Sequence, residues 1–145
     1  MRLSANFVLS EFEVTDTDLP NDVPSRYIKR IQRLVDRVLQ PLRTAVGQPV
    51  HINSGYRSPK VNRAVGGSST SQHMVGEAAD ITVSHMDSQE LADAIDRLNR
   101  SYDQLIRYAP ERGGHVHVSL RARGNRQQRL YAPTAGGYIV DHQEP

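Results

Sequence analysis

The sequence predicts an α+β fold, in which a small, mostly antiparallel sheet is flanked by helices. Short segments with the two-residue alternation of strands are separated by helical segments, but they follow no regular β-α-β order. The chain also has no glycine-rich phosphate loop of the kind that doubly wound sheets carry. At 145 residues it has the length of one domain. We therefore expect a single domain over 1–145, with its core at about 5–120 and a weakly patterned tail over 121–145.

The first third of the chain is predicted to be helical. From residue 23 onward, apolar residues recur every three or four positions while basic residues fall on other faces, which indicates an amphipathic helix. Pro41 is expected to kink or end this helix, because proline has no amide hydrogen to donate. The recurring apolar residues are Ile28, Ile31, Leu34, Val35, Val38, Leu39 and Leu42.

Strand patterns dominate the middle of the chain. On the alanine-rich strand before Val83, Asp80 is expected on the face opposite Ile81. Asp87 and Glu90 have the spacing of a capping box, which predicts an amphipathic helix after them. The expected strands cover residues 50–54, 77–83, 103–106 and 115–120.

Composition narrows the chemistry that the chain can perform. It contains no cysteine, so a metal would be held by histidine, aspartate, glutamate or water. No apolar run approaches the roughly 18 residues of a membrane span. The first residues do not resemble a secretory signal, so we expect synthesis in the cytoplasm or a chain trimmed of its leader.

Arginines gather late in a chain whose formal net charge is +2. A basic segment can attract an anionic polymer such as nucleic acid or a cell-wall glycopolymer. Because acidic residues elsewhere balance this charge, we interpret the cluster as a solvated surface and expect no nucleic-acid partner. The cluster comprises Arg121, Arg123, Arg126 and Arg129.

Two histidines and an aspartate have the spacing of an open metal site. His115 and His117 lie two residues apart on an expected strand, so both point to one face. Asp80 lies on another strand, and His73 stands in the loop before it, where Gly76 permits a turn back over Asp80. A set of His73, Asp80 and His117 would leave a coordination position for water, as hydrolytic zinc chemistry requires. The spacing alone is also compatible with a chain that binds no metal, in which the histidines lie on the surface and the aspartate is buried and hydrogen-bonded.

Four motifs together resemble one family of enzymes. Residues 71–80 read Ser-x-His-x-x-Gly-x-Ala-x-Asp, and residues 115–119 read His-x-His-x-Ser. Residues 54–58 read Ser-Gly-Tyr-Arg-Ser, and residues 103–106 read Asp-Gln-Leu-Ile. Over about 5–120, the chain resembles the zinc D-alanyl-D-alanine carboxypeptidase family of metallopeptidases. Carboxypeptidases, dipeptidases, phage L-alanyl-D-glutamate endolysins and hedgehog-like domains share this fold.

The resemblance implies that His73, Asp80 and His117 are zinc ligands, with water in the fourth position. It also implies a general base that takes the proton of this water, placed shortly before the last ligand histidine. Glu111 stands six residues before His117 and is the expected base. In similar sequences the glutamate commonly follows the Asp-Gln-Leu-Ile strand almost directly, where Tyr108 stands here. The alternative is therefore that Glu111 is an exposed glutamate in a turn and has no catalytic role.

Arg57 is the expected substrate anchor, because a guanidinium group matches a terminal carboxylate or a developing oxyanion. The alternative role for Arg57 is a salt bridge on the protein surface. His115 stands where the family often has an aromatic residue, and it is expected to bond the substrate or the zinc-bound water, or to act as an accessory base. Ser71 and Ser119 are expected to orient the ligands through hydrogen bonds.

These expectations favour a zinc-dependent peptidase that hydrolyses peptidoglycan stem peptides, most simply a D-alanyl-D-alanine carboxypeptidase. Two alternatives stay open: an L-alanyl-D-glutamate endopeptidase of the phage endolysin type, and a non-catalytic, zinc-stabilised binding domain. The expected partner is a peptidoglycan peptide, and we expect a monomer. Such an enzyme would act at the cell wall or in the periplasm, after phage release or removal of a leader.

Overall fold

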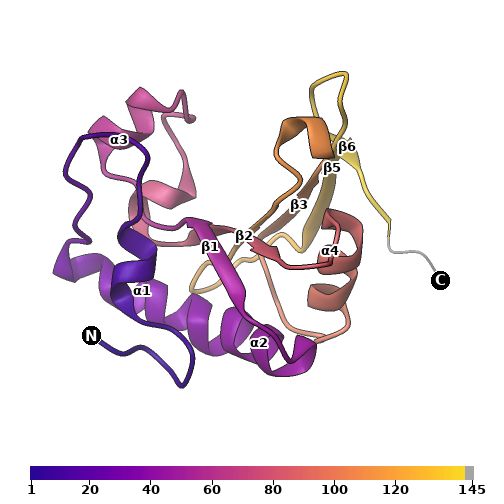
Figure 1. The fold of residues 1–145 in the computed structure, drawn as a ribbon, viewed down its shortest axis with the longest axis horizontal. Helices are drawn as coiled ribbons and strands as arrows, with labels where there is room; N and C mark the ends of the chain where they lie inside the picture. The colour runs from indigo at the N-terminus through magenta and orange to yellow at the C-terminus, as the bar shows by residue number, and fades with distance from the viewer. Residues whose placement is uncertain (143–145) are drawn as a thin grey trace.

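The computed structural model describes residues 1–142, and a sheet of six strands lies at its centre (Figure 1). The strands are Val50–Ser54 (β1), Ala78–Val83 (β2), Gln104–Tyr108 (β3), Val116–Ser119 (β4), Gln128–Ala132 (β5) and Ile139–Val140 (β6). Their order in the sheet is β1-β2-β4-β3-β5-β6. Neighbouring strands are antiparallel except β3 and β5, which are parallel. The predicted α+β class with a mostly antiparallel sheet is confirmed.

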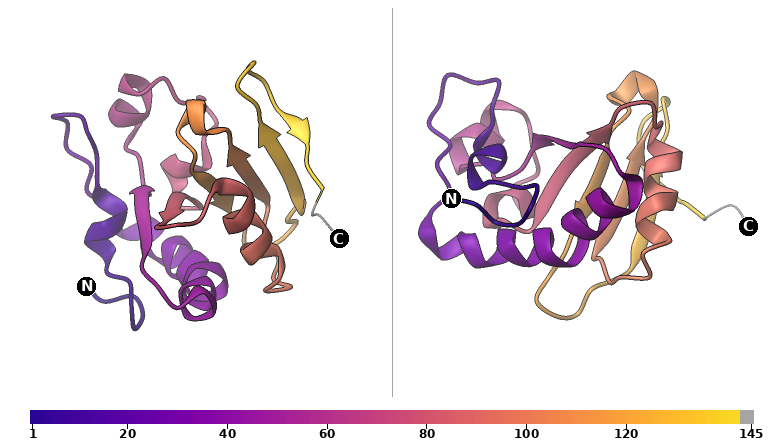
Figure 2. Two further views of the ribbon diagram at one scale, coloured as in Figure 1. Left: turned by 45° about the vertical axis from the view of Figure 1, so that its right-hand side comes forward. Right: turned by 60° about the horizontal axis from the view of Figure 1, so that its bottom comes forward.

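One long helix packs its apolar side on the sheet and consists of Ser25–Leu34 (α1), Val35–Leu39 (η2) and Gln40–Val46 (α2) (Figure 2). Its middle contains a wider turn, in which the Gln40 amide donates to the Val35 carbonyl five residues back. This turn accommodates Pro41, which has no amide hydrogen. The helix therefore continues past Pro41 and ends at Gly47, whose φ of +68° is left-handed. The apolar positions expected from the spacing are buried, apart from Ile28, which is half-buried.

A shorter helix, α4 (Ser88–Asp96), packs against β3 and α2. It begins with the predicted capping box: the Glu90 amide donates to Asp87 Oδ1 at 2.8 Å, and the Asp87 amide donates to Glu90 Oε1 at 3.2 Å. These reciprocal bonds satisfy amides that have no partner within the first turn of a helix. The prediction for this helix is confirmed.

The N-terminal segment supports the loop that follows β1. Within η1 (Leu9–Glu13), Phe12 is fully buried, and its carbonyl accepts a hydrogen bond from the Tyr56 amide at 2.8 Å. Gly55 lies so close to this helix that a Cβ atom there would come within 2.7 Å of Phe12 Cα. A side chain at this position would therefore displace backbone. These contacts fix the loop that carries Arg57.

The chain after β4 also joins the sheet, through β5 and β6. Arg129 on β5 is buried and pairs with two aspartates of α4 and with Asp141 beyond β6. The sequence predicted a weakly patterned tail over 121–145, and within 121–142 the structure adds two strands to the sheet, β5 and β6. The reason for this difference is that the ion pairs holding β5 join residues far apart in the sequence. The end of the expected tail, 143–145, lies outside the described residues.

Three short helices lie in the loops between strands. They are Pro59–Ala64 (α3), Gln72–Val75 (η3) and Pro110–Arg112 (η4). Within residues 1–142, none of the helices combines the length and the apolarity that crossing a bilayer requires.

Candidate metal centre

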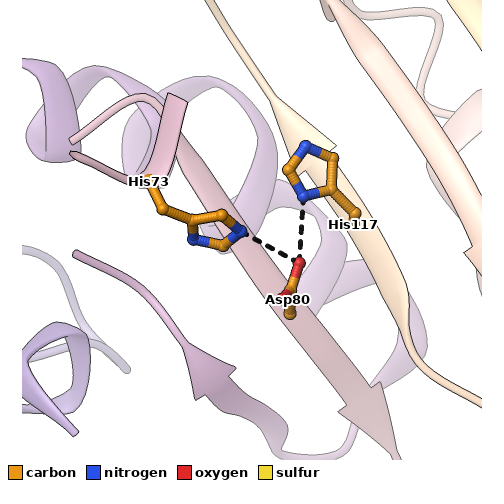
Figure 3. A group of neighbouring side chains, drawn as sticks. All are labelled: His73, Asp80 and His117. Atoms are coloured by element: carbon orange, nitrogen blue, oxygen red, sulfur yellow. Dashed lines mark hydrogen bonds and ion pairs between the residues drawn. The ribbon is translucent and has the colours of Figure 1, made fainter. Parts of the chain in front are cut away.

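The three predicted metal ligands lie together over the middle of the sheet (Figure 3). Asp80 of β2 and His117 of β4 are direct partners in the antiparallel ladder, and His73 approaches them from η3. Asp80 Oδ1 lies 3.2 Å from His73 Nε2 and 3.0 Å from His117 Nδ1. One donor atom from each residue lies within 4.8 Å of the other two. A single ion can therefore contact all three.

His73 is held both at its backbone and at its ring. Ser71 Oγ accepts a hydrogen bond from the His73 amide at 3.2 Å, as expected for a residue that orients a ligand. Ring Nδ1 lies 2.7 Å from the Gly55 carbonyl oxygen. Because a carbonyl can only accept, this partner assigns the ring proton to Nδ1 and leaves a lone pair on Nε2. Gly76, with a φ of +76°, then turns the chain back into β2.

The pKa shifts of His73 and Asp80 are those of groups that can bind a cation. Burial lowers the pKa of His73, which favours a neutral imidazole. Burial raises the pKa of Asp80, but the neighbouring His73 and His117 outweigh this effect and hold its pKa well below the usual range. A neutral His73 and an ionised Asp80 direct lone pairs at the same point. This arrangement is unfavourable in a buried site unless a proton or a metal cation lies between them.

The donor set also has the chemistry that catalytic zinc sites use. Two imidazole nitrogens and one carboxylate oxygen, without a thiolate, leave a coordination position open. The bond from His73 Nδ1 to a backbone carbonyl is the kind of contact that orients a metal-binding histidine. The residues present therefore fit a zinc ion.

Arg57 contacts the candidate centre through Asp80. One terminal nitrogen of Arg57 lies 3.1 Å from Asp80 Oδ2, and its Nε donates to Ser54 Oγ at 3.0 Å. Asp80 thus directs Oδ1 at the histidines while Arg57 occupies Oδ2. The alternative expected for Arg57 was a surface salt bridge, but its ion pair with Asp80 is largely buried, with the two side chains 18% and 12% exposed. Its role as a substrate anchor stays a prediction.

The centre opens into a cleft of about 550 Å³. Its walls come from the loop around residues 66–72, from β3, and from the loop after β4. The polar and aromatic residues that border it include Arg57, Gln72, Tyr108, Arg121, Arg126 and Tyr138. The size and polarity of the cleft suit a short peptide.

Glu111, the expected general base, lies on η4 and is exposed. Its Oε2 accepts a hydrogen bond from Thr134 Oγ1 at 2.8 Å, which lowers the pKa of the carboxyl. It is not among the residues that border the cleft, whereas Tyr108 is. The structure therefore does not bring Glu111 to the other site residues, and its catalytic role stays a prediction.

His115 lies on the same side of β4 as His117, as the two-residue spacing predicted. Its Nε2 is 3.9 Å from Asp80 Oδ2, and its ring stacks on Tyr108 with centroids 4.3 Å apart. Burial lowers the pKa of His115, so its imidazole is neutral near pH 7. Ser119, in contrast, bonds to the Gln104 amide and not to a ligand. A catalytic role for His115 stays a prediction.

Two arginines of the cleft were not predicted from the sequence as site residues. Arg121 and Arg126 were interpreted as part of a solvated surface, yet both border the cleft. Both also pair with Asp103, which is fully buried. An aspartate directly before an apolar strand was the available signal, because a buried carboxylate needs cationic partners.

Comparisons with known proteins agree with these observations. A family model described as Peptidase M15 matches residues 5–119, nearly the segment over which the motifs indicated a resemblance. Among curated proteins, a zinc D-Ala-D-Ala carboxypeptidase of Streptomyces albus G is 32% identical over 117 residues. The alignment covers 79% of this chain and 45% of the relative, so the chain spans less than half the length of that protein.

Proposed function

The chain belongs to the Peptidase M15 family, and on this basis we propose that it is a zinc-dependent peptidase that hydrolyses peptidoglycan stem peptides. The bond assigned to it is the terminal D-alanyl-D-alanine bond, because its relative is named for that activity. The observation that carries the proposal is the meeting of His73, Asp80 and His117 in an open cleft.

His73, Asp80 and His117 would hold the zinc ion. At this site a bound zinc ion would supply a water molecule with a pKa lowered toward about 7 and a Lewis acid for the peptide carbonyl. The protein holds its donors in position for this chemistry. The Gly55 carbonyl fixes the His73 ring, Arg57 fixes the Asp80 carboxylate, and the β2–β4 ladder sets His117 opposite Asp80.

The reaction also needs a group that accepts a proton and passes it to the leaving amine. We assign this role to Glu111, whose bond to Thr134 would have to break for its carboxylate to reach the cleft. His115 is the alternative acceptor on this chain, since its Nε2 already lies 3.9 Å from Asp80. Glutamine is close in size to both glutamate and histidine, but its neutral amide cannot act as a base. It can therefore replace Glu111 or His115 to test which of them accepts the proton.

A second candidate function is a non-catalytic domain that zinc stabilises and that binds wall peptides. The observation that favours it is the exposed position of Glu111, together with Tyr108 in the cleft where a glutamate is common in similar sequences. Such a domain would use the same three ligands and the same cleft. It would bind a stem peptide without cleaving it.

Hydrolysis of a defined muropeptide tests the proposal. The zinc-loaded protein should release free D-alanine, detected by mass spectrometry, and His117→Ala should release none. Glu111→Gln should retain zinc and lose about 10²–10⁴-fold in kcat, the usual contribution of a general base. His115→Gln serves as the matched comparison.

Each of the other outcomes would support a different function or a different catalytic base. Split stem peptides without free D-alanine would indicate an endopeptidase that cuts the L-alanyl-D-glutamate bond. Peptide binding without any cleavage by the zinc-loaded protein would indicate the binding domain. Full activity in Glu111→Gln would remove Glu111 from the mechanism, and a loss confined to His115→Gln would transfer the role of base to His115.

A further inference from the structure

A second group of cations lines the same cleft as the candidate metal centre. Arg121 and Arg126 lie in the loop between β4 and β5, after the last residue that the family model matches, 119. Together with Arg57 they put three guanidinium groups on the cleft. Among the described residues that border it, Asp80 is the only carboxylate. Asp103, which pairs with Arg121 and Arg126 from behind, brings the carboxylates to two against three guanidinium groups, so an excess of positive charge remains even without a metal.

Asp103 ties this pair of arginines to the metal centre. Its Oδ1 accepts bonds from the Arg126 amide at 2.9 Å and from Arg126 Nε at 3.0 Å, and its Oδ2 lies 2.8 Å from a terminal nitrogen of Arg126. Oδ2 also accepts a bond from the Gln72 side chain at 3.0 Å. Because Gln72 directly precedes His73, this bond joins the Asp103 carboxylate to the segment that carries a candidate metal ligand.

Arg121 is an additional cation that Asp103 does not need. Arg126 and Gln72 already donate hydrogen bonds to the Asp103 carboxylate, and Arg121 adds an ion pair in which its Nε lies 3.2 Å from Oδ2. Within residues 1–142, the hydrogen bonds of Arg121 involve its backbone alone, so its terminal nitrogens donate none. The side chains of Arg121 and Arg126 are 44% and 45% exposed. Donors thus remain available on the cleft side for an anion.

The loop that carries the two arginines is fixed by its own hydrogen bonds. The Arg121 amide donates to Asn125 Oδ1 at 2.7 Å, and Asn125 Nδ2 donates back to the Arg121 carbonyl at 3.1 Å. At its far end, Gln127 Oε1 accepts a bond from the Tyr102 amide at 3.1 Å. The pair is therefore held in place before a ligand binds, which lowers the entropy cost of binding.

The position of the pair relative to the centre follows from the sheet. The Asp103 amide donates to the Ser119 carbonyl at 2.7 Å. Ser119 lies two residues beyond His117 on β4, roughly 7 Å at about 3.4 Å per residue. Arg57 follows β1, on the other side of the β2–β4 pair in the strand order. The loop that carries Arg57 and the loop that carries the pair thus follow different strands, β1 and β4, and β2 lies between these strands.

We infer that Arg121 and Arg126 form a subsite for a carboxylate of the peptide substrate, on the amino side of the bond that is cleaved. The inference rests on the proposed function, and on the expected role of Arg57 as the anchor for the carboxyl-terminal side of the substrate. An acidic residue about two positions before that bond reaches the pair, because an extended peptide advances about 3.4 Å per residue. A guanidinium pair binds a carboxylate through charge-assisted hydrogen bonds.

Two peptides that differ only in one charge test this subsite: acetyl-Ala-Glu-D-Ala-D-Ala and acetyl-Ala-Gln-D-Ala-D-Ala. The wild-type enzyme should cleave the glutamyl peptide with a kcat/KM at least about tenfold higher, as expected for a charge-assisted bond. Arg121→Gln should reduce this ratio several-fold, and Arg121→Glu should reverse it. Both variants keep Arg126, so Asp103 retains its main partner. A wild-type ratio near one, or an unchanged ratio in Arg121→Glu, would overturn the inference.

Arg123→Gln is the matched control, because Arg123 is an exposed cation of the same loop that does not border the cleft. Arg123→Gln should keep the wild-type ratio of the two kcat/KM values. If this ratio falls as much in Arg123→Gln as in Arg121→Gln, the preference reflects the overall charge of the protein, and the subsite is overturned. If neither peptide is cleaved, the peptidase proposal fails on its own. Calorimetric titration of the same peptides then tests the subsite. The wild-type protein should bind the glutamyl peptide more tightly than the glutaminyl peptide, and this preference should vanish in Arg121→Glu. Equal binding of the two peptides by the wild-type protein would contradict the subsite.

Discussion

At the scale of single residues, Asp80 is the group on which the candidate centre depends. Its Oδ1 faces both histidines and its Oδ2 is bound by Arg57. The charge of one buried carboxylate therefore serves the metal and the arginine together. Removing that charge without changing the shape of the side chain isolates its contribution.

Asp80→Asn should weaken zinc binding by more than about 100-fold, since changes to residues behind the ligands alone cost about 10–100-fold. The amide has no charge to offer the ion, and Arg57 loses its ionic partner. Competition with a chromophoric zinc chelator measures the affinity. Asp22→Asn, at an exposed aspartate, is the control that should bind zinc as the wild type does. Wild-type affinity in Asp80→Asn would exclude Asp80 as a ligand.

The sequence predicted that His73, Asp80 and His117 would come together, as they do, but it left the position of Glu111 open, for physical reasons. Strand alternation places His115 and His117 on one side of β4 wherever that strand pairs, so their position needs no further information. The location of Glu111 depends on the turn after β3, where Gly113 and Gly114 take φ values of +112° and +66°. No apolar pattern specifies such a turn, because glycine permits many others.

At the scale of elements, buried ion pairs attach β5 to α4. The Arg129 side chain is 6% exposed and lies 2.9 Å from Asp93, 2.6 Å from Asp96 and 2.7 Å from Asp141. Arg107 of β3 also contacts Asp141, at 2.8 Å. The alternation typical of strands is broken by this buried arginine, which explains why the sequence did not predict β5.

Arg129→Met should lower the free energy of unfolding by about 3 kcal/mol, because three carboxylates lose a shared buried partner. Urea unfolding followed by circular dichroism measures the difference. Arg123→Met removes an exposed arginine nearby and should change stability by less than about 0.5 kcal/mol. A similar small change in Arg129→Met would mean that these ion pairs do not hold the C-terminal strands.

The same cluster should make stability depend on acid pH. Burial raises the pKa of Asp141, but bonds from Arg107 and Arg129 outweigh this effect and lower it overall. A lowered pKa means that the carboxylate stabilises the fold above its unfolded pKa, near 4, and that this stabilisation is lost as pH falls through the folded pKa. Asp141→Asn should therefore be less stable than the wild type at pH 7 and differ less from it at pH 3. A difference that stays constant across urea titrations at these pH values would contradict the assignment.

At the scale of the whole molecule, the sheet brings together residues that are distant in the sequence. The metal centre draws on η3, β2 and β4, the Arg57 loop is supported by η1, and the cationic pair lies beyond the segment matched by the family model. The class of fold and the core helix followed from local patterns. The pairing of β2 with β4 and the cleft depend on long-range register, which local patterns do not specify.

Zinc should stabilise the folded protein as a whole, because the unfolded chain does not hold its three ligands together. At a zinc concentration about 100 times the dissociation constant, the expected gain is about 2.7 kcal/mol, which raises the Tm by several degrees. Calorimetry of the chelator-treated and zinc-loaded protein measures this shift. Asp80→Asn should respond much less, and a wild-type Tm that does not change with zinc would contradict the site.

The central claim is that His73, Asp80 and His117 hold a zinc ion in an open cleft. Anomalous diffraction at the zinc absorption edge, from crystals of the zinc-loaded protein, tests it most directly. We expect one peak at about 2.0–2.2 Å from His73 Nε2, His117 Nδ1 and an oxygen of Asp80. A zinc peak elsewhere, with none in contact with these three atoms, would contradict it.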